Sequence, residues 1–152
     1  MGKVKAKPGS STAGTSGAAA SKGTYAYLAW DLPTAARKVS EGLPTGSLEA
    51  VRSVLDLTKR EFADVIHVSV RTLARRKSEE KLPPDESERV YRVGRLLEYA
   101  ASVLGGEDAA RSWMKESNYA LGGVTPLEYV RTEPGAELVE RLLGQIAHGV
   151  PS

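Results

Sequence analysis

Short apolar segments with a helical period, each opened by a capping residue and closed by glycine or proline, divide this sequence. In residues 58–77, TKREFADVIHVSVRTLARRK, Thr58 stands three residues before Glu61, and Ser69 precedes a second such segment. Ser or Thr followed three residues later by Glu satisfies the free N–H groups at the start of a helix. Two short helices joined by a tight turn are therefore predicted, and they limit the fold more than any other feature.

The same signals continue outside this pair. Ser47 is the predicted N-cap of a helix over residues 48–55, which precedes the pair. The helix after Ser69 is expected to run on to Lys81, where Pro83-Pro84 stop it. No stretch shows the period-2 alternation of a strand. The fold class is therefore all-α. The remaining predicted helices cover residues 34–41, 48–55, 85–104, 108–117 and 135–147.

The stretch NYALGGVTPLEYV, residues 118–130, contains two adjacent glycines and a Thr-Pro pair. Asn118 and the glycines supply positive-φ positions that end a helix, whereas Thr125 caps the next helix and Pro126 suits its first turn. A phosphate-binding loop would need a lysine after a strand, and neither is present. The stretch is therefore interpreted as a helix-to-helix turn.

Composition places the chain among ordinary globular proteins, with 41% hydrophobic and 26% charged residues. No run approaches the roughly 18 apolar residues of a membrane helix, and the N-terminus lacks the apolar core of a secretory signal, so a cytoplasmic protein without membrane contact is expected. The absence of cysteine excludes disulfides, thiolate chemistry and sulfur-bound zinc.

Charge is distributed unevenly. Residues 1–23 carry four lysines and no acid, and they are predicted to be a disordered basic leader. Residues 58–81 hold seven basic and four acidic side chains, whereas residues 84–152 hold seven basic and eleven acidic ones. We therefore predict a basic helix-turn-helix domain over residues 24–83 and an acidic helical domain over residues 84–152, each with its own partner.

The helix pair in residues 58–77 has the layout of a DNA-reading unit. Its inner positions are expected to interlock the two helices, and its outer face is basic, as for a helix that enters the major groove. Arg71 and Arg75 are predicted to lie closest to the bases, with Lys59 and Arg76 on phosphates. The alternative is a solvated basic face on an ordinary helical hairpin, and a helix that has lost DNA binding also stays open. The predicted inner residues are Phe62, Ala63, Ile66, Val70 and Leu73, and the predicted DNA contacts are Lys59, Ser69, Arg71, Thr72, Arg75 and Arg76.

Residues suited to catalysis are scarce. His67 and His148 have no acidic partner at metal-ligand spacing, so no metal site is predicted. Adjacent acids at helix ends are solvated faces, and Trp113 and Met114 on an apolar helix face are core. We therefore expect neither an enzyme nor a cofactor.

The chain resembles the Xre/MbcA/ParS-type antitoxins of RES-Xre toxin–antitoxin modules. Their C-terminal toxin-binding domain is similar to the run from Ala100, through the helix of Trp113, NYALGGVTPLEYV and TEPGAELVERLLGQIAHG, and the likeness covers about residues 36–149. The resemblance implies a type II antitoxin that covers the active site of a RES-domain toxin, which degrades NAD⁺ or transfers ADP-ribose. It also implies a homodimer, a larger toxin–antitoxin complex and repression of the antitoxin's own operon through operator DNA.

The last helix and the tail are the toxin-binding surface that the resemblance implies. An acidic domain suits a cleft that must be positive to hold a pyrophosphate. Two alternatives remain: a stand-alone regulator with a ligand-sensing C-terminal domain, which predicts a closed apolar pocket there, and a structural helical adaptor without a DNA role. The predicted toxin contacts are Glu137, Glu140, Arg141, His148, Gly149, Val150, Pro151 and Ser152.

Overall fold

The structure is a computed structural model that describes residues 26–149, and the predicted disordered leader lies outside these residues. The described part contains helices and two isolated bridges, with no strand, so the all-α prediction is confirmed. In chain order the elements are η2 (Tyr27–Ala29), α2 (Leu32–Glu41), α3 (Gly46–Leu55), α4 (Lys59–Val65), α5 (Val70–Arg75), η3 (Arg76–Ser78), α6 (Pro84–Leu104), α7 (Glu107–Lys115), η4 (Tyr119–Leu121), α8 (Pro126–Tyr129) and α9 (Glu133–His148).

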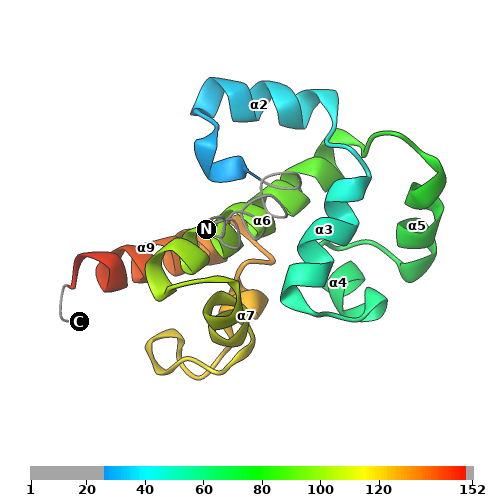
Figure 1. Cartoon of the computed structure of the whole chain (residues 1–152). Coiled ribbons are helices and arrows are strands. Elements are labelled where there is room, and N and C mark those ends of the chain that lie inside the picture. The colour runs from blue at the N-terminus through cyan, green and yellow to red at the C-terminus, as the bar shows by residue number, and fades with distance from the viewer. Residues whose placement is uncertain (1–25, 150–152) are drawn as a thin grey trace, which may run out of the picture.

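Helix α6 is the axis of the molecule. It crosses the middle of the structure with α3, α4 and α5 at one end, α2 above it and α9 alongside its other half (Figure 1). Its apolar side packs on η2, α2 and α3 as well as on α7 and α9. The domain boundary predicted at residues 83 and 84 falls at its first residue, and it stays a prediction because α6 serves both halves. The fully buried residues of this side are Val90, Val93, Leu96, Leu97 and Ala100.

Most predicted helix starts are confirmed. Thr58 and Glu61 form a reciprocal capping box, the side chain of Ser69 accepts the N–H of Thr72, and Thr125 caps α8. The long helix ends at Gly105, which has a φ of 102°. Local hydrogen-bonding chemistry therefore sets these boundaries.

Three local predictions were wrong. Ser47 is buried inside the first turn of α3, which begins one residue earlier. The helix after Ser69 stops at Arg75, because residues 79–82 turn back: the N–H of Leu82 donates to the carbonyl of Leu43 at 2.8 Å. Asn118 has an extended φ of −123° and caps η4 with its side chain, so in this turn the glycines alone have positive φ.

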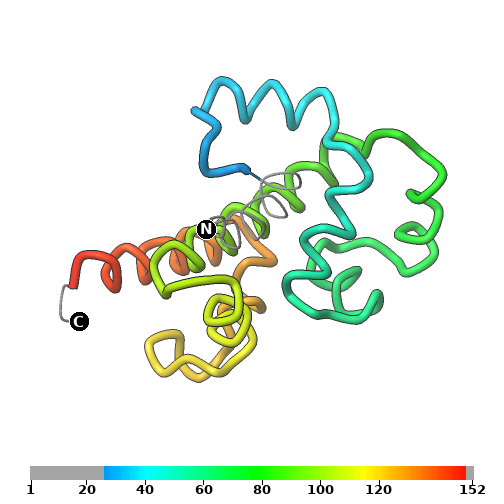
Figure 2. The backbone as a smooth tube through the Cα atoms, in the orientation of Figure 1, coloured from blue at the N-terminus to red at the C-terminus, as the bar shows by residue number. Residues whose placement is uncertain are grey.

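The segment after residue 25 is held against α6 by aromatic packing. Tyr27 is buried, with its ring centroid 5.0 Å from that of Trp30 and 5.3 Å from that of Tyr91. Its ring lies over Gly94, where an added Cβ would be 2.6 Å from a ring carbon. The tube in Figure 2 shows this start of the described chain returning to α6 before α2 leads away. Among residues 26–149, no helix combines the length and the apolar character needed to cross a bilayer.

Candidate functional site

Helices α4 and α5 form the predicted helix-turn-helix. The turn between them spans residues 66–69, and His67 adopts a φ of 60° there. Four of the five predicted inner residues are buried: Phe62, Ala63, Ile66 and Leu73. Val70 is 39% exposed instead, because it is the first residue of α5 and lies on the outer side of the turn.

The outer face of α5 presents the predicted base contacts to solvent. Arg71 and Arg75 are exposed, as is Lys59 at the start of α4. Ser69 and Thr72 are occupied with each other: the Ser69 Oγ accepts the N–H of Thr72 at 3.0 Å and donates to the Thr72 Oγ1 at 3.0 Å. These two residues therefore shape the start of the helix, and their role as DNA contacts stays a prediction.

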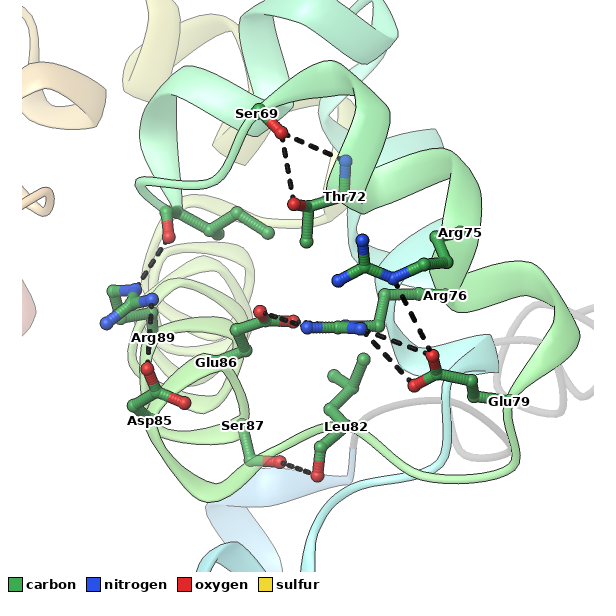
Figure 3. Close-up of polar contacts among 11 residues, drawn as sticks. Ser69, Thr72, Arg75, Arg76, Glu79, Leu82, Asp85, Glu86, Ser87 and Arg89 are labelled. Atoms are coloured by element: carbon green, nitrogen blue, oxygen red, sulfur yellow. Dashed lines mark hydrogen bonds and ion pairs between the residues drawn. The ribbon is translucent and has the colours of Figure 1, made fainter.

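Arg76 differs from the other predicted DNA contacts because it is buried. Its side chain points away from the exposed face toward α6 (Figure 3), and the residue is only 8% exposed. Its Nε donates to the Glu86 Oε1 at 2.8 Å, its Nη2 to the Glu86 Oε2 at 2.7 Å, and its Nη1 to Glu79 at 3.3 Å. A buried guanidinium that is bound by two carboxylates is poorly placed to contact a phosphate. Arg76 therefore ties α5 to α6, and this position argues against the predicted phosphate contact.

Cationic side chains from the second half of the chain cap the helices of the first half. The Nε of Arg111 donates to the Val54 carbonyl at 2.6 Å, and the Nζ of Lys115 lies 3.0 Å from the Leu55 carbonyl, both at the end of α3. The Nε of Arg89 donates to the carbonyl of Ile66 at 2.6 Å, at the end of α4. The last carbonyls of a helix lack partners and carry partial negative charge, which such cations satisfy.

The turn of the helix-turn-helix also touches the segment just before α9. His67 donates from Nε2 to the carbonyl of Arg131 at 2.9 Å, and Arg92 donates to the same carbonyl at 3.2 Å. The Arg131 side chain returns to α4, where its Nη1 lies 3.9 Å from Asp64. The expectation of an ordinary turn histidine did not include this contact, because 64 residues separate the two partners.

Helix α9 carries an apolar stripe on its outward side. Val139 and Leu143 are buried against α6, but Leu138 is 45% exposed and Ile146 is 41% exposed. Leu142, half-buried, lies between them at a spacing of four residues, so the three side chains share one face. We call Leu138, Leu142 and Ile146 the α9 stripe.

The predicted acidic contacts on α9 are engaged within the chain. Glu140 accepts from Arg95 of α6 at 2.6 Å, so its charge is already paired within the chain. Glu137 accepts from Arg141 at 2.8 Å, and both are exposed beside the α9 stripe. His148 and Gly149 are exposed at the end of the helix, where Gly149 has a φ of 65°. Residues Val150, Pro151 and Ser152 lie outside the described residues.

The described residues bring no metal-ligand cluster together, since no group of three His, Asp or Glu side chains is placed to hold an ion. Met114 is buried as predicted, and Trp113 is half-buried at the edge of the core. A groove of about 530 Å³ lies between η2, α6 and α9, and it is edged by charged residues that include Arg92, Arg95 and Glu133.

Comparisons with known proteins match two family models to this chain. The family model of the antitoxin Xre-like helix-turn-helix domain matches residues 34–95, and that of the antitoxin Xre/MbcA/ParS C-terminal toxin-binding domain matches residues 100–149. The chain is 34% identical over 116 residues to the antitoxin Xre of Photorhabdus laumondii, covering 75% of this chain and 78% of that protein. It is 29% identical over 114 residues to the antitoxin Xre of Yersinia enterocolitica, covering 74% and 77%.

Two further matches are more distant. The Prs ADP-ribosylating antitoxin of a Sphingobium species is 25% identical over 121 residues, covering 73% of this chain and 76% of that protein. A chain in the crystal structure of the M. tuberculosis MbcT–MbcA toxin–antitoxin complex superposes with a TM-score of 0.55 at 24% identity, covering 71% of this chain and 96% of that chain. At that identity the superposition supports the shared fold only. With its Xre-like helix-turn-helix and its matched C-terminal domain, the chain belongs to the Xre family of antitoxins and is a component of a toxin–antitoxin system.

Proposed function

We propose that this antitoxin neutralises a RES-domain toxin by laying α9 over the toxin's active-site cleft. The α9 stripe carries the proposal, because it exposes large apolar side chains on the last helix of a domain that matches a toxin-binding family. Exposed apolar patches with a polar rim mark protein-binding surfaces. Glu137 and Arg141 supply that rim beside the stripe.

The chemistry of the toxin favours such a surface. A RES-domain enzyme acts on NAD⁺, so its cleft has to hold a pyrophosphate and therefore carries positive charge. The C-terminal half of this chain carries four more acidic than basic side chains over residues 84–152. Opposite charge speeds the encounter of two proteins, and burial of apolar side chains then supplies the affinity.

A growth assay tests the toxin-binding half of the proposal. In cells that express a RES-domain toxin, co-expression of the wild-type antitoxin should restore growth and cellular NAD⁺, and the Leu138→Asp/Ile146→Asp double variant should not. Val70→Asp is the matched control, because Val70 is 39% exposed on α5 and does not line the groove that borders α9. Circular dichroism is the control for folding of each variant. Rescue by the double variant at equal expression would overturn the role of the stripe.

A truncation tests the end of the chain separately. Removal of residues 147–152 takes away the last two residues of α9 and the predicted tail contacts but leaves Ile146 and the buried positions of the helix. We expect weaker co-purification with the toxin and an unchanged melting temperature. A truncated chain that restores growth as well as the full chain would remove the tail from the proposal.

We further propose that α4 and α5 bind operator DNA of the antitoxin's own operon. Arg71 and Arg75 are exposed on one face of α5, at the spacing of one helical turn, and they supply the bidentate donors that read guanine. Arg71→Ala should weaken binding of the upstream DNA fragment by about 1–3 kcal/mol and relax specificity, as measured by fluorescence anisotropy. Arg37→Ala on α2 is the control. If Arg71→Ala and Arg75→Ala both leave affinity unchanged, α5 does not read DNA.

The alternative of a ligand sensor has a different geometric requirement. It needs a closed and mostly apolar pocket in the C-terminal half, whereas the groove between η2, α6 and α9 is edged by Glu88, Arg92, Arg95, Glu133 and Glu140. These side chains are paired with one another: Arg92 with Glu88 on the same helix and with Glu133 of α9, and Arg95 with Glu140 of α9. The groove therefore supports the antitoxin proposal over the sensor.

A further inference from the structure

A hollow of about 290 Å³ lies between α3, α4 and α5, on the same unit that carries the proposed base contacts. Its floor is apolar, formed by Leu48, Phe62 and Leu73. Its rim is cationic, with Arg52 from α3, Lys59 from α4 and Lys77 from η3. Three helical elements thus bring three positive side chains to one edge.

The charges on this rim are not balanced. Glu49, the acid beside the hollow, is bound by the guanidinium of Arg52, which it contacts through both oxygens, and by the hydroxyl of Ser53 at 3.3 Å. Arg52 also donates a hydrogen bond from its Nη1 to the carbonyl of Leu57 at 2.7 Å. Glu49 and Arg52 therefore neutralise each other, and the two lysines keep their charge.

Lys59 and Lys77 lie beside each other and are both exposed. The close approach of the like-charged Lys77 ammonium lowers the pKa of Lys59. Two like charges at contact repel each other, and an anion placed between them replaces that repulsion with two attractions. An ammonium is a compact charge with three donors, which suits the oxygens of a phosphate.

We propose that Lys59 and Lys77 together hold one backbone phosphate of the bound DNA. This inference rests on the proposed binding of operator DNA and adds Lys77, which the sequence analysis did not assign. Lys59 opens α4 and Lys77 follows the end of α5, so a single phosphate between them fixes both helices against one strand. Contacts to phosphates set the position of the protein on the duplex, and contacts to bases then select the sequence.

The pair has a defined signature in binding experiments. Each phosphate that is neutralised contributes about 0.9 to the slope of log K against log salt, which is about 3.5-fold in affinity between 50 and 200 mM salt. Either lysine alone still neutralises the shared phosphate, so Lys59→Gln or Lys77→Gln should change the slope little. The Lys59→Gln/Lys77→Gln double variant should lose about 0.9 of the slope. Arg37→Gln on α2 is the charge-matched control and should lose none.

A second measurement identifies the phosphate. In a set of upstream DNA fragments that each carry one neutral methylphosphonate linkage, one position should weaken binding of the wild-type protein severalfold. The same position should leave binding of the double variant unchanged, because its contact is already lost. An inorganic phosphate titration, followed by NMR of the lysine side chains, tests the other source: a site saturated by free phosphate with no methylphosphonate effect would contradict the inference.

The two failures are distinguishable. If the wild-type protein binds no DNA, the proposed operator function falls and this inference falls with it. If the wild-type protein binds DNA but the double variant keeps the full salt slope, or the losses of the two single variants add, only the shared phosphate is overturned. Folding of the double variant is checked by circular dichroism, and Lys59→Ser/Lys77→Ser repeats the slope measurement if Lys59→Gln/Lys77→Gln is unstable, since both lysines are exposed.

Discussion

Removal of one partner of the buried ion pair between Arg76 and Glu86 should cost more stability than removal of one partner of an exposed pair. The side chains of Arg76 and Glu86 are 10% and 8% exposed, and two nearly parallel N–H···O bonds of 2.8 and 2.7 Å join them. Removal of one partner from a buried pair leaves an uncompensated charge, which costs about 3–5 kcal/mol. Glu86→Leu should cost about 3 kcal/mol of stability, the lower end of this range, because Glu79 still holds the guanidinium at 3.3 Å.

Arg76→Leu should cost about 5 kcal/mol of stability, the upper end of the range for breaking a buried pair. The reason is that among the described residues Arg76 is the one cation that bonds to Glu86. With an m-value of about 2 kcal/mol per M, these losses lower the urea midpoint by about 1.5 and 2.5 M. The readout is urea unfolding followed by circular dichroism. Removal of both charges in Arg76→Leu/Glu86→Leu should recover most of the lost stability, since apolar replacements of a buried pair are often neutral.

The adjacent Arg75 provides the matched control. Its side chain is 57% exposed and 3.9 Å from Glu79, so Arg75→Leu should cost at most about 1 kcal/mol. Two results would refute the reasoning: single substitutions at Arg76 and Glu86 that cost no more than Arg75→Leu, or a double variant that loses the sum of the two single effects. Either would mean that water reaches the pair.

Two further perturbations test the attachment of the N-terminal segment to α6. Gly94→Ala should cost about 1–3 kcal/mol in thermal unfolding, because the new Cβ would lie 2.6 Å from the Tyr27 ring and 3.2 Å from Val51. Burial raises the pKa of Glu98 to about 7 from 4.5, although its carboxylate accepts the N–H of Leu28 at 2.8 Å. The folded chain then binds a proton that the unfolded chain has released, so stability should fall as the pH rises from about 4.5 to about 7, and Glu98→Gln should lack that fall in urea titrations.

The helix boundaries were largely predictable because their causes are local. A capping box needs two side chains three residues apart, and Thr58 with Glu61 satisfies that condition within a single turn. The error at Ser47 has a different origin. Ser47 is buried close to Tyr27, which lies 20 residues earlier in the sequence, and this tertiary packing leaves no local signal that a good capping residue will lie inside a helix.

The outward face of α5 was only partly predictable, for the same reason. Basic residues at helical spacing do not reveal which of them is neutralised by a carboxylate from another element. Arg75 and Arg76 are adjacent in sequence, yet one is exposed and the other is bound to Glu86, which follows two prolines and a separate helix start. Helical spacing in the sequence cannot predict a bond to a carboxylate ten residues away on another helix.

The same long-range contacts bear on how the two proposed activities relate. The turn that orients α5 is held at Ile66 by Arg89 and at His67 by the carbonyl of Arg131, which stands just before α9. A movement of α9 that displaced this carbonyl would break the bond to His67, a residue already in a positive-φ conformation that most side chains avoid. A ligand shifts an equilibrium only by its differential affinity for two states. Occupancy of the α9 stripe by a toxin would therefore change operator affinity only to the extent that it moves this junction, and otherwise the two surfaces act as independent sites on one rigid support.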